Sequence, residues 1–252
     1  MSLFSLEGRT ALVTGAGRGI GYAIAEALAQ AGARVFLNGR SAEALETAVG
    51  RLRGAGLEAD VARFDVTDPA EVAQGVTAIE AAGPLDILVN NAGIQRRAPL
   101  DQFKDEDWRE LMSVNIDSVY YVSKAVAPAM IERGQGKIIN IASVQSELAR
   151  PGIAPYTASK GAVRNLTRGM CADWARHGLQ INAIAPGYFA TPLNQALVED
   201  PAFDDWLRKR TPAGRWGKLE DLHGIAVFLA SSASDFVNGQ TIYVDGGITS
   251  VI

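Results

Sequence analysis

Residues 14–21 read Thr-Gly-Ala-Gly-Arg-Gly-Ile-Gly, between an apolar segment, Arg9 to Thr14, and an Ala-rich segment, Ile20 to Ala31. The first segment is typical of a buried strand, and the second has the apolar spacing of a helix. Glycines at such a junction allow a tight turn and let backbone N–H groups approach a pyrophosphate at the positive end of the helix. An ordinary strand-to-helix turn is the alternative. The stretch predicts a dinucleotide site formed by Gly15, Gly17, Arg18, Gly19, Ile20 and Gly21.

The same alternation of Val- and Ile-rich segments with longer Ala-rich ones continues along the chain, and it is typical of βαβ units. It predicts an α/β fold: a single Rossmann-type, doubly wound parallel sheet of about seven strands flanked by helices, in one domain over residues 1–252. The expected strands are Arg9–Thr14, Arg34–Asn38, Ala59–Phe64, Leu85–Asn90, Lys137–Ala142, Leu179–Ile184 and Thr241–Val244. The expected helices are Ile20–Ala31, Ala42–Ala55, Pro69–Ala82, Asp107–Arg133, Thr157–His177 and Leu219–Ala230.

Composition limits the partners. The 252 residues include 24 Lys+Arg and 28 Asp+Glu, a formal charge of −4, so we expect no nucleic-acid partner. The lone Cys171 and the two distant histidines, His177 and His223, do not supply the ligands of a structural metal site. Neither a leader-like N-terminus nor a run of about 18 apolar residues occurs. We therefore expect a cytoplasmic protein with no membrane partner.

Residues 186–216 form the least regular stretch of the chain, with charges of both signs and three prolines after Pro186. It also carries the aromatic residues Tyr188, Phe189, Phe203 and Trp206. In open α/β sheets the ligand binds beyond the carboxyl ends of the strands, so a long excursion after a late strand is typical of a substrate lid. A packed surface subdomain is the alternative.

The end of the second expected strand indicates the cofactor. An NAD-preferring site usually has an acidic residue there, whereas this chain has Asn38, Gly39 and Arg40. The guanidinium of Arg40, with Arg18 as a second cation, suits the 2′-phosphate of NADP. This predicts NADP(H) in preference to NAD(H). A solvated Arg40 at the start of a helix is the alternative.

Two further strand ends are candidate cofactor contacts. Asp65 and Val66 follow the third expected strand, where Asp65 either meets the adenine or caps the helix that starts near Pro69. The fourth strand ends in Asn-Asn-Ala-Gly at residues 90–93, and small residues with Asn amides suit a turn pressed against a cofactor. The predicted contacts there are Asn91, Ala92 and Gly93.

The residues that carry chemistry follow the fifth expected strand. Ser143 stands at its carboxyl end, and Tyr156 and Lys160 open the next helix four residues apart, on one helix face. A phenol has an ordinary pKa of about 10, so we expect the Lys160 ammonium and an oxidised nicotinamide to lower the pKa of Tyr156. Ser143 would then hold the substrate oxygen while Tyr156 transfers its proton.

Together these motifs resemble the short-chain dehydrogenase/reductase family over the whole chain: the residue 14–21 loop, Asn90 to Gly93, Asn115, Ser143, the Tyr156-x-x-x-Lys160 pair and Pro186-Gly187 stand in family order. The resemblance implies a homotetramer and four catalytic residues, Asn115, Ser143, Tyr156 and Lys160. It also implies that Tyr156 and Lys160 contact the cofactor, that Asn115 supports a proton relay with Lys160, and that Pro186, Gly187 and Thr191 flank the nicotinamide. From the residues alone, Asn115 would be a polar residue within a helix.

Within the family, five segments resemble members that reduce a keto sugar acid: residues 90–97, 146–150, 166–171, 185–189 and 210–217. Such a substrate needs a cation for its carboxylate and polar groups for its hydroxyls. The candidate substrate contacts are Arg96, Arg97, Ser143, Gln145 and Glu147. The arginines have an alternative role, surface pairing with Asp101, Asp105 or Glu106.

Other readings of the site and of the assembly stay open at this point. The site could serve another carbonyl, such as a 3-oxoacyl thioester or a different keto sugar acid, or the chain could be a nonenzymatic NADP-binding regulator. The tetramer implied by the resemblance would use the Asp107–Arg133 and Thr157–His177 helices and the tail from Asp245 to Ile252. The two helices could equally pack only on their own sheet.

Overall fold

Seven parallel strands form one sheet, as the alternation in the sequence predicts, and their order is β3-β2-β1-β4-β5-β6-β7. The computed structural model describes residues 3–191 and 194–252, so Met1, Ser2, Pro192 and Leu193, the last two within the expected lid, lie outside the described residues. The strands are β1 (Thr10–Val13), β2 (Arg34–Gly39), β3 (Ala59–Arg63), β4 (Ile87–Asn90), β5 (Gly136–Ile141), β6 (Leu179–Pro186) and β7 (Thr241–Val244). The strand order reverses between β1 and β4, where open sheets of this kind bind their ligands.

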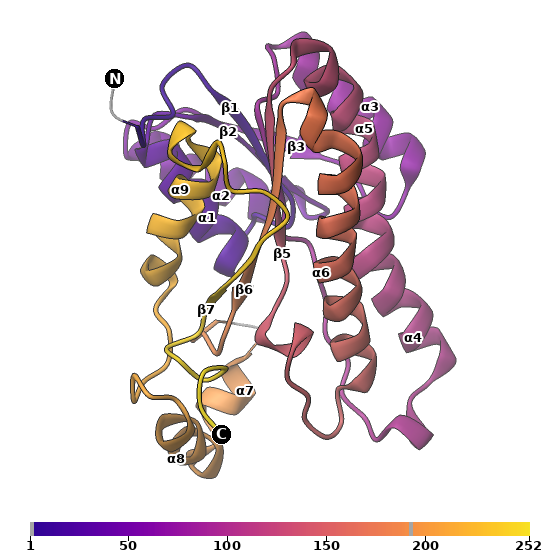
Figure 1. Cartoon of the computed structure of the whole chain (residues 1–252), viewed down its shortest axis with the longest axis vertical. Coiled ribbons are helices and arrows are strands. Elements are labelled where there is room, and N and C mark those ends of the chain that lie inside the picture. Colours follow the sequence, from indigo (N-terminus) through magenta and orange to yellow (C-terminus); the bar gives the residue numbers. More distant parts are fainter. Residues whose placement is uncertain (1–2, 192–193) are drawn as a thin grey trace.

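Helices cover both faces of the sheet (Figure 1). One buried cluster joins the sheet to α1 (Gly19–Gln30), α2 (Ala42–Gly54) and α9 (His223–Ala230). The other cluster joins it to α3 (Pro69–Ala81), α5 (Ser118–Arg133) and α6 (Ala154–Trp174). Because both faces are covered, the central strands are almost continuously apolar and β4 and β5 are buried along their whole length.

The prediction of one continuous helix over Asp107–Arg133 is wrong. The structure divides it into α4 (Asp105–Met112) and α5, which are joined by a π-helical turn over Ser113–Asp117. Such turns place an extra residue in a helix and are frequent at functional sites. Here the turn carries Asn115, whose side chain is buried. The apolar spacing continues through the turn, so the sequence pattern does not reveal it.

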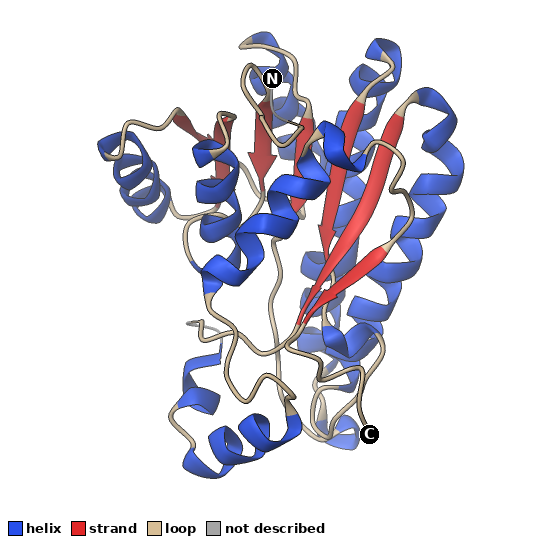
Figure 2. Ribbon diagram, turned by 60° about the vertical axis from the view of Figure 1, so that its left-hand side comes forward, coloured by secondary structure: helices blue, strands red, loops and turns tan. Residues whose placement is uncertain are grey.

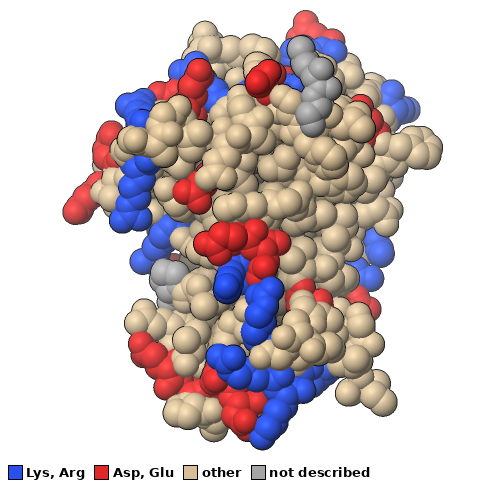
Figure 3. All heavy atoms as spheres, turned by 90° about the vertical axis from the view of Figure 1, so that its left-hand side faces the viewer, with Lys and Arg blue, Asp and Glu red and all other residues tan. Residues whose placement is uncertain are grey.

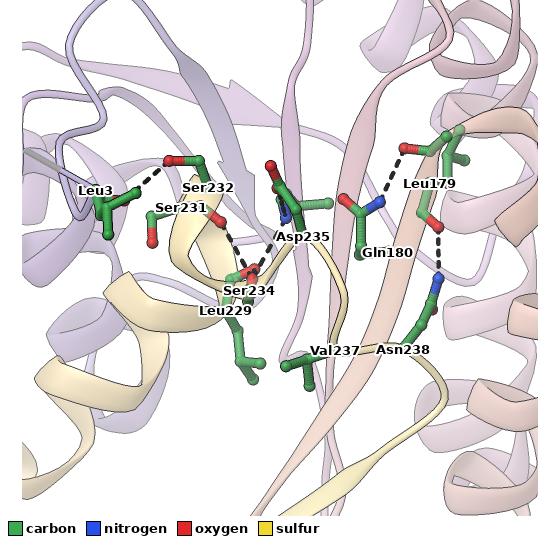
Figure 4. A network of polar contacts seen from close by, with 12 residues as sticks. Leu3, Leu179, Gln180, Leu229, Ser231, Ser232, Ser234, Asp235, Val237 and Asn238 are labelled. Carbon is green, nitrogen blue, oxygen red and sulfur yellow. Dashed lines mark hydrogen bonds and ion pairs between the residues drawn. The ribbon is translucent and has the colours of Figure 1, made fainter. Parts of the chain in front are cut away.

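Polar contacts tie the amino edge of the sheet together (Figure 4). The Asn238 amide donates to the Leu179 carbonyl at 2.8 Å, at the start of β6, and its oxygen accepts from the Ile181 amide at 2.8 Å. At the start of β5, the Lys137 ammonium lies 2.7 Å from an Asp235 carboxylate oxygen. Polar groups at this edge therefore have partners within the fold.

Beyond the carboxyl edge lie α7 (Gln195–Val198), α8 (Pro201–Arg210) and the C-terminal residues (Figure 2). A small third core attaches them to the sheet and contains Val144, Leu207, Trp216 and Ile248. The exposed side of α8 carries ion pairs at 2.7 Å between Asp204 and Arg208 and between Asp205 and Lys209. Accordingly, charges of both signs lie side by side in the lower part of the face in Figure 3. No helix among the described residues is long and apolar enough to cross a membrane.

Candidate active site

A cavity of about 460 Å³ opens at the carboxyl edge of the sheet. Its walls come from the turn after β1, the ends of β4, β5 and β6, the start of α6 and the segment that leads into α7. It therefore lies at the reversal of strand order and extends toward α7 and the segment that leads to it. The predicted residues that line it are Gly15, Arg18, Gly19, Ile20, Gly21, Asn91, Ala92, Gly93, Ser143, Gln145, Tyr156, Lys160, Pro186, Gly187 and Thr191.

Two positions of the glycine-rich turn, Gly15 and Gly21, leave no room for a side chain. A Cβ atom on Gly21 would come within 2.4 Å of the Asn91 Nδ2 atom and 2.5 Å of the Gly15 carbonyl oxygen. Gly15 has a φ of +63°, and a Cβ there would lie 2.9 Å from the Ala92 Cα atom. The Asn91 amide donates to the carbonyls of Thr14, at 2.9 Å, and Gly15, which fixes the turn against β4. The turn is therefore a rigid backbone cradle.

The start of α1 suits an anion. Its N-terminal residue, Gly19, follows Arg18, whose side chain makes no capping hydrogen bond to the described residues. The first N–H groups of a helix have no partner within the helix, and the helix dipole is positive there. Since this helix end lines the cavity, the residues present fit a dinucleotide pyrophosphate.

Four predicted cofactor residues do not line the cavity. These are Gly17 in the turn after β1, Arg40 after β2, and Asp65 and Val66 after β3. Arg40 is exposed, so its guanidinium is accessible to a phosphate. Burial acts to raise the pKa of Asp65, but hydrogen bonds from Thr67 and the charge of Arg40 lower it overall. Asp65 does not cap α3, because Asp68 accepts the capping bonds from Ala70 and Glu71. Of the two roles that the sequence left open for Asp65, the helix cap is therefore wrong, and the adenine contact stays a prediction.

Ser143, Tyr156 and Lys160 meet in the cavity. Ser143 follows β5, and its hydroxyl forms a hydrogen bond with the Tyr156 hydroxyl. Tyr156 and Lys160 lie one turn apart on α6, with the ammonium 5.8 Å from the centre of the phenol ring. The Lys160 ammonium donates to the Ile141 carbonyl at 2.6 Å, which ties it to the end of β5. The sequence spacing therefore brings a proton donor, a hydrogen-bonding hydroxyl and an amine to one place.

The electrostatics of this group differ from the expectation. Burial raises the pKa of Tyr156 above its ordinary value, and the hydrogen bond from Ser143 and the positive charge of Arg97 offset this only in part. Burial also lowers the pKa of Lys160 to about 8. The pKa of Tyr156 is therefore raised, because burial dominates, and the expected lowering is wrong for the residues of the chain alone.

Asn115 holds the loop after β4. Its side-chain oxygen accepts from the Ile94 amide at 2.8 Å, and its nitrogen donates to the Ile94 carbonyl at 3.0 Å. The same nitrogen donates to the Ser159 hydroxyl on α6 at 3.1 Å. Asn115 thus connects the π-helical turn to the loop and to the helix that carries Tyr156 and Lys160.

The comparisons with known proteins agree with this geometry. Residues 15–249 match a family model described as enoyl-(acyl carrier protein) reductase. The chain is 64% identical to a gluconate 5-dehydrogenase of Gluconobacter oxydans, over 98% of this chain and 97% of that relative. The chain belongs to the short-chain dehydrogenase/reductase family. It is also 53% identical to a 5-keto-D-gluconate 5-reductase of Escherichia coli, with the same coverage.

Among solved structures, the fold of this family member is similar to the crystal structure of a gluconate 5-dehydrogenase from Burkholderia cenocepacia in complex with NADP and tartrate. The TM-score is 0.97 at 62% sequence identity, and the likeness covers 99% of this chain and 98% of that one. The short-chain dehydrogenase/reductase fold expected from the sequence is therefore confirmed, together with oxidoreductase chemistry.

Three predicted substrate residues, Arg96, Arg97 and Glu147, are not among the residues that line the cavity. The Arg96 guanidinium pairs with Glu110 at 2.7 Å and with Asp107 at 3.5 Å, both on α4. These ion pairs favour the alternative role of Arg96, surface pairing, although with other acidic partners than expected. Glu147 pairs with Arg164 and accepts from the Tyr243 hydroxyl. Its carboxylate therefore has partners outside the cavity lining, and a substrate contact of Glu147 stays a prediction.

Arg97 and Gln145 remain near the catalytic residues. The positive charge of Arg97 acts on the hydroxyls of both Tyr156 and Tyr188. Gln145 is buried in the cavity wall and donates to the Tyr188 hydroxyl at 3.5 Å. Its side-chain oxygen has no hydrogen-bond partner among the described residues.

The cavity wall also contains residues that the sequence does not predict as part of the site, among them Tyr188 and Arg150. In the sequence, Tyr188 is only one of several aromatic residues in the 186–216 segment. Arg150 stands in a resemblance segment, but no spacing rule connects it to the site. Its distance in sequence from the strand end gives no signal, because only the folded loop brings it back to the cavity.

Proposed function

We propose that this chain is an NADP-dependent gluconate 5-dehydrogenase that interconverts 5-keto-D-gluconate and D-gluconate. The observation that carries the proposal is the meeting of Ser143, Tyr156 and Lys160 in a cavity beside the glycine-rich turn. The similarity to gluconate 5-dehydrogenases over almost the whole chain supports the choice of substrate.

In the reductive direction, the hydroxyl of Ser143 donates a hydrogen bond to the C5 carbonyl oxygen of the keto acid. When bound, NADPH supplies the hydride that C5 receives. Tyr156 donates its proton to the oxygen, which becomes the C5 hydroxyl. Burial favours the protonated phenol, the form that this direction requires. In the oxidative direction the same phenolate oxygen takes the proton back.

Lys160 restores the proton on Tyr156. Its pKa of about 8 lets the amine gain and lose a proton near neutral pH, so it can pass protons without a large free-energy cost. The Ile141 carbonyl holds the Lys160 amine in place. The same amine can also anchor the nicotinamide ribose. Asn115 positions this relay by fixing the loop after β4 to α6.

The proposed cofactor contacts run across the strand ends. The rigid turn from Gly15 to Gly21 would hold the pyrophosphate, and Arg40 with Arg18 would pair with the 2′-phosphate. Asp65 and Val66 would lie near the adenine. Asn91, Ala92, Gly93, Tyr156, Lys160, Pro186, Gly187 and Thr191 would complete the site toward the nicotinamide.

We also propose that residues 186–216 act as a substrate lid on one NADP-binding domain, and that Arg97, Ser143 and Gln145 contact the substrate. A homotetramer in the cytoplasm completes the proposal. Trp108 on α4 and Tyr120 on α5 are 42% and 45% exposed, and large exposed aromatic side chains on these helices support an interface there.

A steady-state comparison of NADPH with NADH on 5-keto-D-gluconate tests the cofactor and the substrate together. We expect the chain to reduce 5-keto-D-gluconate with NADPH. We also expect a kcat/KM for NADPH at least about tenfold above that for NADH, because one charged hydrogen bond to the 2′-phosphate contributes about 1.5–3 kcal/mol. Arg40→Ser should remove this preference, with Arg53→Ser, which lies on α2 and pairs with Asp60, as the control. Turnover of a 3-oxoacyl thioester but not of the keto acid would contradict the substrate. Tight NADPH binding without turnover of any carbonyl would contradict the enzymatic function.

A further inference from the structure

Arg150 lines the wall of the cavity, and its positive charge acts on the guanidinium of Arg97 beside the cavity. Burial lowers the pKa of Arg97 most, and the charge of Arg150 lowers it further. Neither forms an ion pair with an acidic side chain in residues 3–191 and 194–252, and Arg97 donates only to the Gln95 side chain at 3.1 Å. Like charges held together without an intervening anion destabilise a site, so the arrangement favours an anionic ligand.

Arg150 lies on the side of the cavity where Tyr188 and Phe203 stand. Its guanidinium donates a hydrogen bond to the Tyr188 hydroxyl and lies 5.8 Å from the centre of the Phe203 ring on α8. Tyr188 and Phe203 both belong to the segment that follows β6, whereas the proton donor Tyr156 stands on α6. Arg150 is therefore held by two aromatic side chains on the side of the cavity that this segment forms.

Gln145 supplies an independent sign that a polar ligand belongs there. Its side chain is 7% exposed, lines the cavity and donates to the Tyr188 hydroxyl. Its side-chain oxygen is buried without a partner among the described residues. A buried amide oxygen without a hydrogen bond is costly, and a ligand hydroxyl would satisfy it.

We propose that Arg150 binds the substrate carboxylate and so makes this site prefer a keto acid over an uncharged ketose. The inference rests on the proposed function and adds the residue that determines this specificity. In 5-keto-D-gluconate the carboxylate is four carbon–carbon bonds from the reacting C5. With C5 at Tyr156 and Ser143, the acid end extends toward Tyr188 and Arg150, and the hydroxyls between them pass Gln145.

The test compares the variants Arg150→Gln and Arg150→Lys on two ketones. One is 5-keto-D-gluconate, and the other is 5-keto-D-fructose, which has the same chain length and no carboxylate. For Arg150→Gln we expect the KM for the acid to rise on the order of 10- to 100-fold while kcat and the KM for the ketose stay unchanged. Arg150→Lys keeps the charge without the planar fork, so we expect an intermediate KM for the acid.

Arg109→Gln is the control for net charge, because Arg109 is 72% exposed on α4 and its side chain lies 4.0 Å from Asp105. We expect it to leave both KM values unchanged. Binding of D-gluconate, followed by tryptophan fluorescence, should weaken in Arg150→Gln by the same factor as the KM rises, with NADPH binding unchanged. If the unaltered chain does not reduce 5-keto-D-fructose, the binding of D-gluconate still tests the role of Arg150.

Equal rises in KM for both ketones, or unchanged binding of D-gluconate in Arg150→Gln, would overturn the role of Arg150 and leave the proposed function intact. Failure of the unaltered chain to reduce 5-keto-D-gluconate, while it reduces another ketone with NADPH, would overturn the proposed function and the role of Arg150 with it.

Discussion

A buried lysine lies at each end of strand β5: Lys137 belongs to the strand, and Lys160 reaches its other end from α6. The two ammonium groups have opposite surroundings. Lys137 at the amino end is 9% exposed, and Lys160, whose ammonium binds the carbonyl of Ile141 at the carboxyl end, is 5% exposed. Lys137 has a carboxylate partner, Asp235, at 2.7 Å. Lys160 has only a backbone carbonyl at 2.6 Å and no acidic partner among the described residues.

The two lysines differ in how burial changes the pKa of the amine. Burial lowers the pKa of both amines, but Asp235 opposes this at Lys137. At Lys160 burial acts alone and lowers the pKa to about 8. A charge that only supports the fold is paired, whereas a group that must change its protonation state is left without a fixed counter-charge. The amino edge of the sheet therefore serves stability, and the carboxyl edge accepts a loss of stability for reactivity.

The largest expected effect distinguishes the two lysines by activity. Lys160→Met should lower kcat/KM for 5-keto-D-gluconate by about 10²- to 10⁴-fold, because it removes the proton relay and the ribose anchor. Lys137→Met, the matched control, should leave kcat/KM unchanged and cost about 1 kcal/mol of unfolding free energy through its lost ion pair. Steady-state kinetics and urea denaturation measure both. A comparable loss of activity in the two variants would end the distinction between the edges.

A smaller effect concerns the pH dependence of stability. Between pH 8 and 10.5 the unfolded chain keeps the proton on Lys160, whereas the folded chain has released it. The unfolded state then binds more protons, so the unfolding free energy of the unaltered chain should rise with pH across this window. A depression from 10.5 to about 8 corresponds to a rise of about 3 kcal/mol relative to Lys160→Met, in which the group is absent.

Denaturation of both proteins at pH 7, 8, 9 and 10.5 measures this rise as a difference, in which other titrating groups cancel. The penalty for the buried charge is complete below pH 8 and disappears as the pH rises through 10.5. A stability difference that stays constant over the window would show that Lys160 titrates at its ordinary pKa.

Much of the fold follows from the sequence because it depends on local patterns. Val- and Ile-rich segments predict all seven strands, and the glycines of residues 15–21 predict the turn at the start of α1. The spacing of Tyr156 and Lys160 predicts their common helix face. These features depend on backbone periodicity, which the sequence carries directly.

The remainder depends on which side chains meet across the fold. Sequence does not reveal that Arg96 turns to Glu110, or that Arg150 reaches the cavity instead. It also gives the wrong direction for the pKa of Tyr156, because the spacing shows the nearness of Lys160 but not the burial that dominates. Distances between loops and degrees of burial are properties of the packed chain.

The Tyr156→Phe variant shows whether the Tyr156 hydroxyl transfers the proton. The ring and its packing remain while the proton is lost, so NADPH should bind with unchanged affinity and kcat for 5-keto-D-gluconate should fall by about 10²- to 10⁴-fold. Tyr120→Phe, at an exposed ring on α5, should retain full turnover. Turnover of Tyr156→Phe close to that of the unaltered chain, with NADPH still bound, would contradict the account.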